Sequence, residues 1–500
     1  MRAALLGLLL LALGCARAAP DSAAPPSAPA PVKSTAATLI LTADLRGYLA
    51  PCGCSENMRG GIARAAQVLA QARQEGPPLL LIDAGDALFG LPPISPEEVG
   101  QEELKARALS QAFLKMGIAA HAVGPLDVKR GEGFERSLGL PDLVPGIPKL
   151  LDAGGHPIAV VSGASQAAIA SGAKAARAQG AQWVAGLFLG SWKDAQTLAA
   201  GKDAGVDLLV SSHAEEELDH EESHLVRAAT PLVALQSKGR SLLRVDLSFG
   251  QGPFQLLQTQ SELEKDAQGL TQRISLFDQQ ANLPGLPAQT VKAMEAKIAS
   301  LATRRAALLA TRPKVPQGEN AYAVRFLPLE ATLPQAADVA AIVHRYDQEV
   351  GQVNLAWARA HPRACPQPAP GQASYVGTAA CAECHPEAFA FYRTTKHAHA
   401  YVTLAAVGKQ YRVDCVRCHV TGYDQPGGAC GVDRVEARKN VGCEACHGPG
   451  SIHADDPSSD NVRAKPGREV CVGCHNQENS PHFDFALYLP QILGKGHGGK

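Results

Sequence analysis

Eight of the 13 cysteines of this chain occur in four copies of one short pattern, Cys-x-x-Cys-His, within its last quarter. Two cysteines at this spacing can add to the two vinyl groups of one haem, and the next histidine is then held under the iron as its proximal ligand. The sequence therefore predicts four covalent haems c. The predicted attachment and ligand residues are Cys381, Cys384, His385, Cys415, Cys418, His419, Cys443, Cys446, His447, Cys471, Cys474 and His475.

Structural zinc and plain disulfides are the alternatives, because paired Cys-x-x-Cys motifs also form tetrahedral thiolate sites. A zinc ribbon has no need of a histidine directly after every second cysteine. Here the histidine follows in all four copies, so we favour haem over zinc.

Further histidines between residues 361 and 497 decide what the irons can do. We predict His397 and His453 as distal iron ligands, and leave His399, His482 and His497 open between ligation and an ordinary surface position. Iron with ligands on both faces suits electron transfer, whereas iron with an open face can bind a small molecule. The main prediction is an electron carrier without catalytic residues. The alternative is an oxidoreductase acting on a small nitrogen or oxygen species.

The haem-motif region also carries longer patterns around the motifs. Three of its segments read T-x-H-A, D-C-x-x-C-H-V-x-G and V-G-C-E-x-C-H-G-P-G, at Thr395–Ala398, Asp414–Gly422 and Val441–Gly450. In these segments the chain resembles the cytochrome c-554 family of tetrahaem electron carriers. The resemblance implies redox partner proteins and a distal ligand role for His397, and in many relatives also for the histidine at the position of His453.

The N-terminal segment has the features of an export signal. A short basic start precedes an apolar run from Leu5 to Leu13, which is too short to span a bilayer. Gly14-Cys15 resembles a lipobox, so Cys15 is the predicted lipidation site, with ordinary cleavage after Ala18 as the alternative. We predict a periplasmic or cell-envelope bacterial lipoprotein with no transmembrane helix, which would contact the membrane through its lipid. A net charge of -1 argues against nucleic acid as a partner.

The sequence between the export signal and the haem motifs predicts the elements that must position the haems. Short aliphatic runs alternate with Ala-rich stretches from residue 38 to residue 250, which predicts an α/β domain. Helical periodicity on both sides of Leu283–Gly285 predicts a helical hairpin. A strand near Tyr322–Leu329 and a helix over Ala337–Ala358 should follow. The predicted division is a signal peptide 1–14, a flexible linker 15–37, the α/β domain 38–250, the hairpin and connecting helix 251–360, a Pro-rich hinge 361–374, a mainly α, haem-packed cytochrome domain 375–490 and a tail 491–500.

The α/β domain resembles the metallophosphatase domain of UshA-type 5′-nucleotidases, through Leu39–Gly47, Gly60–Arg64 and Leu80–Gly90. The resemblance implies a layered β-sandwich flanked by helices, and a two-metal cluster. Of the family's metal ligands, Asp44 and Asp86 remain, but Arg46 replaces a histidine and Gly124-Pro125-Leu126 replaces Gly-Asn-His. We therefore predict a scaffold or docking module that has lost catalysis. The alternative is a metal-dependent phosphoester hydrolase with a cytochrome attached.

Cys52 and Cys54 have no counterpart in that family. A disulfide between them, a disulfide from one of them to Cys365 or Cys430, and a redox or metal role near the haems stay open. His213 is either a relic of a metal ligand or an ordinary loop histidine.

Overall fold

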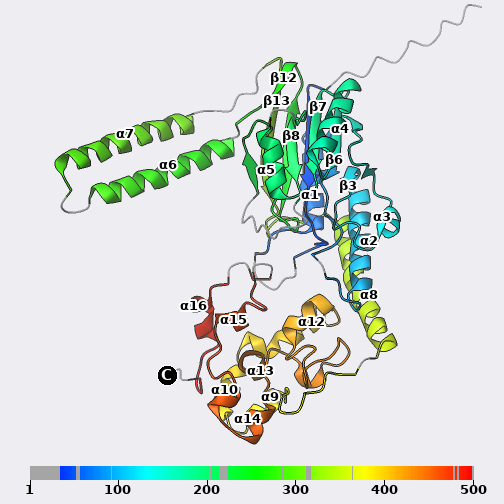
Figure 1. Cartoon of the computed structure of the whole chain (residues 1–500), viewed down its shortest axis with the longest axis vertical. Coiled ribbons are helices and arrows are strands. Elements are labelled where there is room, and N and C mark those ends of the chain that lie inside the picture. The colour runs from blue at the N-terminus through cyan, green and yellow to red at the C-terminus, as the bar shows by residue number, and fades with distance from the viewer. Residues whose placement is uncertain are drawn as a thin grey trace, which may run out of the picture.

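The computed structural model describes residues 34–51, 57–91, 93–201, 204–212, 223–258, 260–282, 286–310, 317–362, 364–476, 479–480 and 483–497. Cys15, Cys52, Cys54, His213 and His482, which the sequence singles out, lie outside these residues. Figure 1 shows an α/β unit, a helical hairpin that projects from it, and a mainly helical C-terminal unit beneath.

Two sheets form the centre of the α/β unit. The described strands of the first sheet follow the order β12 (Gln251–Leu256), β13 (Glu319–Pro328), β11 (Ser241–Ser248), β1 (Ala36–Thr42), β2 (Leu79–Asp83), β3 (Ile118–Ala122) and β4 (Asp142–Leu143). Those of the second sheet follow the order β5 (Lys149–Asp152), β6 (Pro157–Gly163), β7 (Trp183–Phe188), β8 (Leu208–Ser211), β10 (Leu232–Ala234) and β9 (His224–Val226).

The side chains of β1 show why the two sheets stack. Leu39 and Leu41 lie in the apolar cluster between the sheets, which also contains Trp183, whereas Ile40 lies in the cluster under the helices. This alternation buries both faces of the strand. The helices α1 (Ile62–Gln74), α2 (Val99–Lys115) and α8 (Ala337–Ala360) line the first sheet, and α4 (Gln166–Ala178) and α5 (Trp192–Ala200) line the second. The predicted layered α/β fold is confirmed.

The helical hairpin is an insertion in the first sheet. It consists of α6 (Gln260–Ala281) and α7 (Ala288–Ala310), which extend away from the sheets in Figure 1, so the predicted hairpin is confirmed. The strands on either side of it, β12 and β13, pair with each other, and β13 pairs with β11. The predicted division after residue 250 therefore falls inside one sheet. The strand β12 is mostly exposed, and its one apolar alternation, Phe254 and Leu256, is too short to mark a strand in the sequence.

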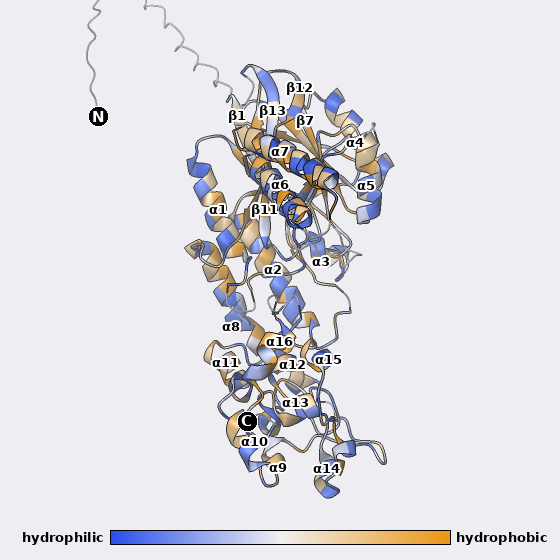
Figure 2. Ribbon diagram, turned by 90° about the vertical axis from the view of Figure 1, so that its left-hand side faces the viewer, coloured by the Kyte–Doolittle hydropathy of each residue, from blue (hydrophilic) through white to orange (hydrophobic). Residues whose placement is uncertain are grey.

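The C-terminal unit is made of short helices joined by long loops. They are α9 (Thr378–Cys381), α10 (Pro386–Tyr392), α11 (Ala400–Ala406), α12 (Val413–His419), α13 (Cys443–His447), α14 (Ser451–Asp455), α15 (Arg468–Cys471) and α16 (Phe485–Tyr488), and in its described residues none exceeds seven residues. Figure 2 shows apolar colour along the sheet strands above and a mixed pattern in this unit. Helices this short are not stable in isolation. Contacts with groups outside each helix must therefore stabilise them.

Within the described ranges, no helix combines the length and apolar character needed to cross a membrane.

Candidate haem site and domain interface

The four Cys-x-x-Cys-His motifs lie on or directly after short helices of the C-terminal unit. Their eight thiols are unpaired and partly or fully exposed, with Cys384 and Cys474 the most accessible. Cysteine is usually a buried residue, so eight accessible thiols need an explanation, and thioether bonds to haem provide one. The motifs also approach one another, because the Cys381 thiol contacts that of Cys443 and the Cys418 thiol contacts that of Cys474.

Two pairs of histidine rings lie at the separation that two imidazole ligands of one iron require. The ring centres of His385 and His453 are 6.2 Å apart with an angle of 17° between the ring planes. The ring centres of His397 and His475 are also 6.2 Å apart, at 48°. Two imidazoles bound to opposite faces of one metal, with metal–nitrogen bonds of about 2 Å, place their ring centres about 6 Å apart. The residues therefore fit a haem iron held by histidine on both faces.

Hydrogen bonds fix the tautomer that such ligation needs. The Nδ1 atoms of His419, His447 and His453 lie 2.6, 2.8 and 2.9 Å from the backbone oxygens of Ala400, Arg463 and Ser458. A carbonyl can only accept, so each Nδ1 carries the proton and donates it, and each Nε2 keeps its lone pair. Metal-binding histidines are oriented in the same way by a second hydrogen-bond partner.

The other histidines differ from this arrangement. His399 uses Nε2 to contact the carbonyl oxygen of Arg393 at 3.1 Å, so that nitrogen is occupied. Burial lowers the pKa of His397, and the nearby His475 lowers it further, which favours the neutral form that binds metal. His497 lies near His447 and His385, whose charges add to the effect of burial in lowering its pKa.

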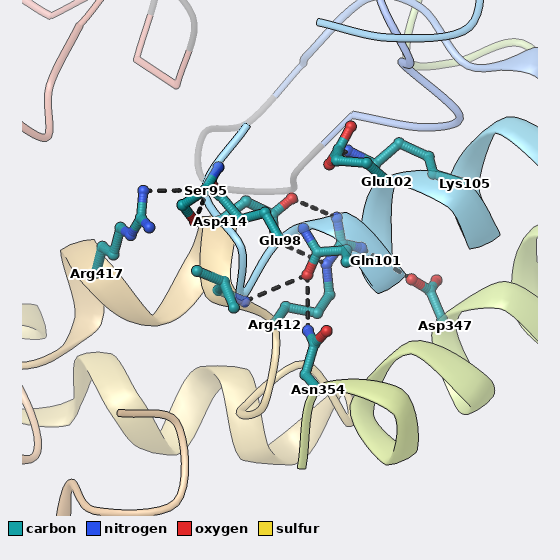
Figure 3. Close-up of polar contacts among 11 residues, drawn as sticks. Ser95, Glu98, Gln101, Glu102, Lys105, Asp347, Asn354, Arg412, Asp414 and Arg417 are labelled. Carbon is teal, nitrogen blue, oxygen red and sulfur yellow. Dashed lines mark hydrogen bonds and ion pairs between the residues drawn. The ribbon is translucent and has the colours of Figure 1, made fainter. Parts of the chain in front are cut away.

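The helix that carries the second motif packs against the α/β unit (Figure 3). Gln101 of α2 accepts hydrogen bonds through Oε1 from the amide of Asn354 at 2.8 Å and from the backbone N–H of Val413 at 3.3 Å. Asn354 of α8 also donates to the carbonyl of Tyr411 at 2.9 Å. Gln101 and Asn354 are buried, so buried hydrogen bonds join three segments distant in sequence, and among the described residues Nε2 of Gln101 and Oδ1 of Asn354 have no partner.

Two arginines extend this interface on both sides of Cys415. Arg412 contacts Asp347 at 3.0 Å and Asp414 at 2.7 Å. Arg417 contacts Glu97 at 2.9 Å, and its guanidinium also contacts Glu98 at 3.2 Å. These contacts fix the α12 helix, and with it the second pair of motif thiols, on the surface formed by α2 and α8 (Figure 3).

We expect this interface to weaken in acid. Burial alone would raise the pKa of Asp414, but the Arg412 guanidinium outweighs burial and holds that pKa well below its usual range. A carboxyl whose pKa is depressed by folding stabilises the fold above its ordinary pKa of about 4, and loses that contribution as the pH falls through the depressed value. In Arg412→Gln the main charge that offsets burial is gone, so the interface should be weaker at neutral pH and should no longer weaken as the pH falls. Hydrogen exchange of the segment around residue 413 measures this, with Arg136→Gln on the exposed end of α3 (Glu132–Arg136) as the control.

A disulfide joins Cys365 to Cys430, and so ties the Pro-rich segment to the C-terminal unit. The alternative in which Cys52 or Cys54 bonds to one of these two cysteines is therefore wrong. A cross-link over 65 residues stabilises the folded state by about 4 kcal/mol in the chain-entropy account.

The remnant phosphatase positions lie at the ends of β1 and β2. Arg46 donates to both carboxylate oxygens of Asp44, at 2.8 and 2.9 Å. The oxygens of Asp86 accept hydrogen bonds from the Leu126 N–H, at 2.8 Å, and from the Ser212 hydroxyl. All four carboxylate oxygens are thus engaged, and the guanidinium carries a fixed positive charge beside Asp44. The residues present do not fit a two-metal cluster.

Asp127 is a buried residue that sequence reasoning missed. Its carboxylate accepts four backbone hydrogen bonds, from Asp86, Ala87, Leu88 and Gly124, at 2.7 to 2.8 Å. The available signal was an acidic residue two positions after the proline of a Gly-Pro turn that follows a buried strand. Asp127 holds together the two loops in which the phosphatase ligands would lie. Burial and the charge of Asp127 together raise the pKa of Asp86 to about 7.

Together, the motifs and the facing imidazoles define a multihaem c-type cytochrome, built onto an α/β sandwich. The sequence profile described as "Cytochrome c554 and c-prime" matches residues 380–448. Cytochrome c-554 of Nitrosomonas europaea is 30% identical over 161 residues, which cover 25% of this chain and 68% of that protein. The chain belongs to the cytochrome c-554 family through its C-terminal region, and haem c is the cofactor of that family.

Solved structures of other proteins are similar to part of the chain. The 5′-nucleotidase precursor from Thermus thermophilus has a TM-score of 0.41 and 12% identity, covering 63% of this chain and 59% of that one. The calcineurin-like phosphoesterase YfkN from Bacillus subtilis has a TM-score of 0.39 and 14% identity, covering 65% of this chain and 99% of that one. The chain thus spans about three fifths of the Thermus nucleotidase.

Proposed function

We propose that this chain is an exported electron carrier with four covalent haems, whose α/β unit is a non-catalytic scaffold for the haem domain. The facing pairs His385–His453 and His397–His475 are the observation that supports it most directly. Histidine on both faces leaves an iron no open position, so it exchanges electrons without binding substrate. Donor and acceptor would be other redox proteins.

The scaffold part of the proposal rests on the interface in Figure 3. Arg412 and Arg417 fix the second motif to acidic residues of the α/β unit and of α8. A helix bound in this way keeps its haem at a constant distance from its neighbours, and electron transfer between haems depends on that distance. This scaffold role does not require the α/β unit to hydrolyse phosphoesters.

The haem count and the export signal are tested together by intact mass. We expect the purified mature protein to exceed its polypeptide mass by four haems, and by a diacylglyceryl group if Cys15 is lipidated. The Cys15→Ser variant should lose the lipid and keep the haems. A mature protein with the mass of its amino acids alone, or one that releases zinc where iron was expected, would refute the proposal.

We also expect no phosphoesterase activity. The guanidinium of Arg46 occupies Asp44, so added manganese or zinc should give no hydrolysis of nucleotide or phenyl phosphate substrates above the rate of an Asp86→Ala variant. An assay with both metals measures this directly. Metal-dependent hydrolysis that the Asp86→Ala change abolishes would show an intact hydrolase instead.

A further inference from the structure

A second cluster of ionisable side chains lies at the β4 edge of the first sheet, beside α3, which connects β3 to β4. His121 of β3 and Asp142 of β4 are partners in the parallel register. Glu135 belongs to the connecting helix α3. One ligand atom from each of the three side chains lies within 4.8 Å of the others.

These three side chains have polar atoms that lack a partner. Nε2 of His121, Oε1 of Glu135 and Oδ1 of Asp142 are buried and form no hydrogen bond with any described residue. The His121 side chain is fully buried, and Glu135 is 3% exposed. Buried polar atoms are nearly always satisfied, so three unsatisfied atoms on side chains this close together indicate a missing partner.

The orientation of His121 points to the kind of partner. Its Nδ1 lies 3.0 Å from the Asp83 carboxylate, which also accepts from the Gly85 N–H at 3.0 Å. Asp83 thus engages Nδ1 and leaves Nε2 as the nitrogen available to an ion, as in carboxylate–histidine–metal arrangements. Burial alone would lower the pKa of His121, but the hydrogen bond to Asp83 and the charge of Asp127 raise it to about 9, so an ion would take the place of the Nε2 proton. The nearest other carboxylate to Nε2 is that of Asp127 at 3.9 Å, which is too far for a hydrogen bond.

We propose that His121, Glu135 and Asp142 bind one zinc ion, which links β3, α3 and β4. Imidazole nitrogen and carboxylate oxygen are both zinc ligands, and the two negative charges balance the ion. Ligand atoms in a tetrahedral zinc site are about 3.5 Å apart, so shifts of about 1 Å close the present spacing. Asp142 is partly exposed, and its side of the cluster gives an ion access and room for a water ligand.

A shared proton between the two carboxyls is the competing arrangement. Burial, the charge of Asp142 and a hydrogen bond between the two carboxyls together raise the pKa of Glu135 to about 7, so Glu135 can share its proton with Asp142. Lys149 also lies near, donating to the Pro141 carbonyl at 3.3 Å, and its charge lowers the pKa of Asp142 that burial raises. A shared proton would satisfy the carboxyls alone, whereas a zinc ion also satisfies Nε2 of His121.

The test uses holoprotein, in which the motif thiols are bonded to haem and are not available to zinc. Protein stripped with a chelator and dialysed against zinc should bind one zinc per chain, with nitrogen and oxygen neighbours only in zinc-edge X-ray absorption. Glu135→Gln and Asp142→Asn should each weaken binding by more than about tenfold. Glu132→Gln, an exposed change on the same helix α3, should leave the zinc affinity unaltered.

Three results would overturn the inference. They are the absence of stoichiometric zinc in stripped and dialysed wild-type protein, sulfur among the zinc neighbours, and equal affinity in both ligand variants and the Glu132→Gln control. Far-UV circular dichroism shows whether each variant is folded. The zinc stoichiometry of the wild-type protein tests the inference even if a variant does not fold. The haem proposal is independent, because haem content is read from iron and zinc binding is read from zinc.

Discussion

Replacing His453 by alanine is expected to give one additional haem per chain that is high-spin and binds carbon monoxide. The ring of His453 faces that of His385 at 6.2 Å, so it is placed to close the second face of the first haem. Without it the iron has an open face, and the protein loses the axial ligand that sets its potential. Optical and paramagnetic resonance spectra of the ferric protein measure the spin state, and carbon monoxide titration of the reduced protein counts open irons.

His399→Ala is the matched control for this experiment. Its Nε2 contacts the Arg393 carbonyl, so its removal should leave spin state and carbon monoxide uptake as in the wild type. His397→Ala should behave like His453→Ala, but at the haem of the fourth motif, because its ring faces His475. If His453→Ala and His399→Ala give the same spectra as the wild type, the assignment of His453 as a distal ligand is wrong.

Replacing Asp127 by alanine is expected to destabilise the α/β unit by about 3–5 kcal/mol. The carboxylate accepts four backbone N–H groups, and each buried donor left unsatisfied costs about 1–3 kcal/mol. Part of that cost is recovered, because a buried charge is removed as well. Urea unfolding followed by far-UV circular dichroism measures the change. Amide exchange at Asp86, Ala87 and Leu88 should rise most.

Asp152→Ala provides the control for Asp127. Asp152 also accepts a backbone hydrogen bond, from Gly155 at 2.8 Å, but on an exposed turn where water can replace it. Its loss should change stability by about 0.5 kcal/mol or less. Equal effects of the two variants would mean that the four bonds to Asp127 contribute no more than one exposed bond does.

The sequence determined the haem motifs and most of the elements. Two thiols and a histidine that serve one haem are contiguous in the chain, so their chemistry can be recognised without a fold. Aliphatic runs such as Leu79–Asp83 and Trp183–Leu189 likewise predict strands, because burial on both faces leaves a local apolar pattern. The helical hairpin was equally visible in its periodicity.

Tertiary structure decided which distant groups meet. Nothing local in the sequence pairs His397 with His475, far along the chain, or places Gln101 on the N–H of Val413. The cluster of His121, Glu135 and Asp142 was also missed, because its members come from two strands and a connecting helix that are adjacent only in the folded sheet. The spacing of residues along a chain predicts individual helices and strands, but not which of them come into contact. Contacts between elements depend on how the sheets, α2 and the short haem-domain helices pack.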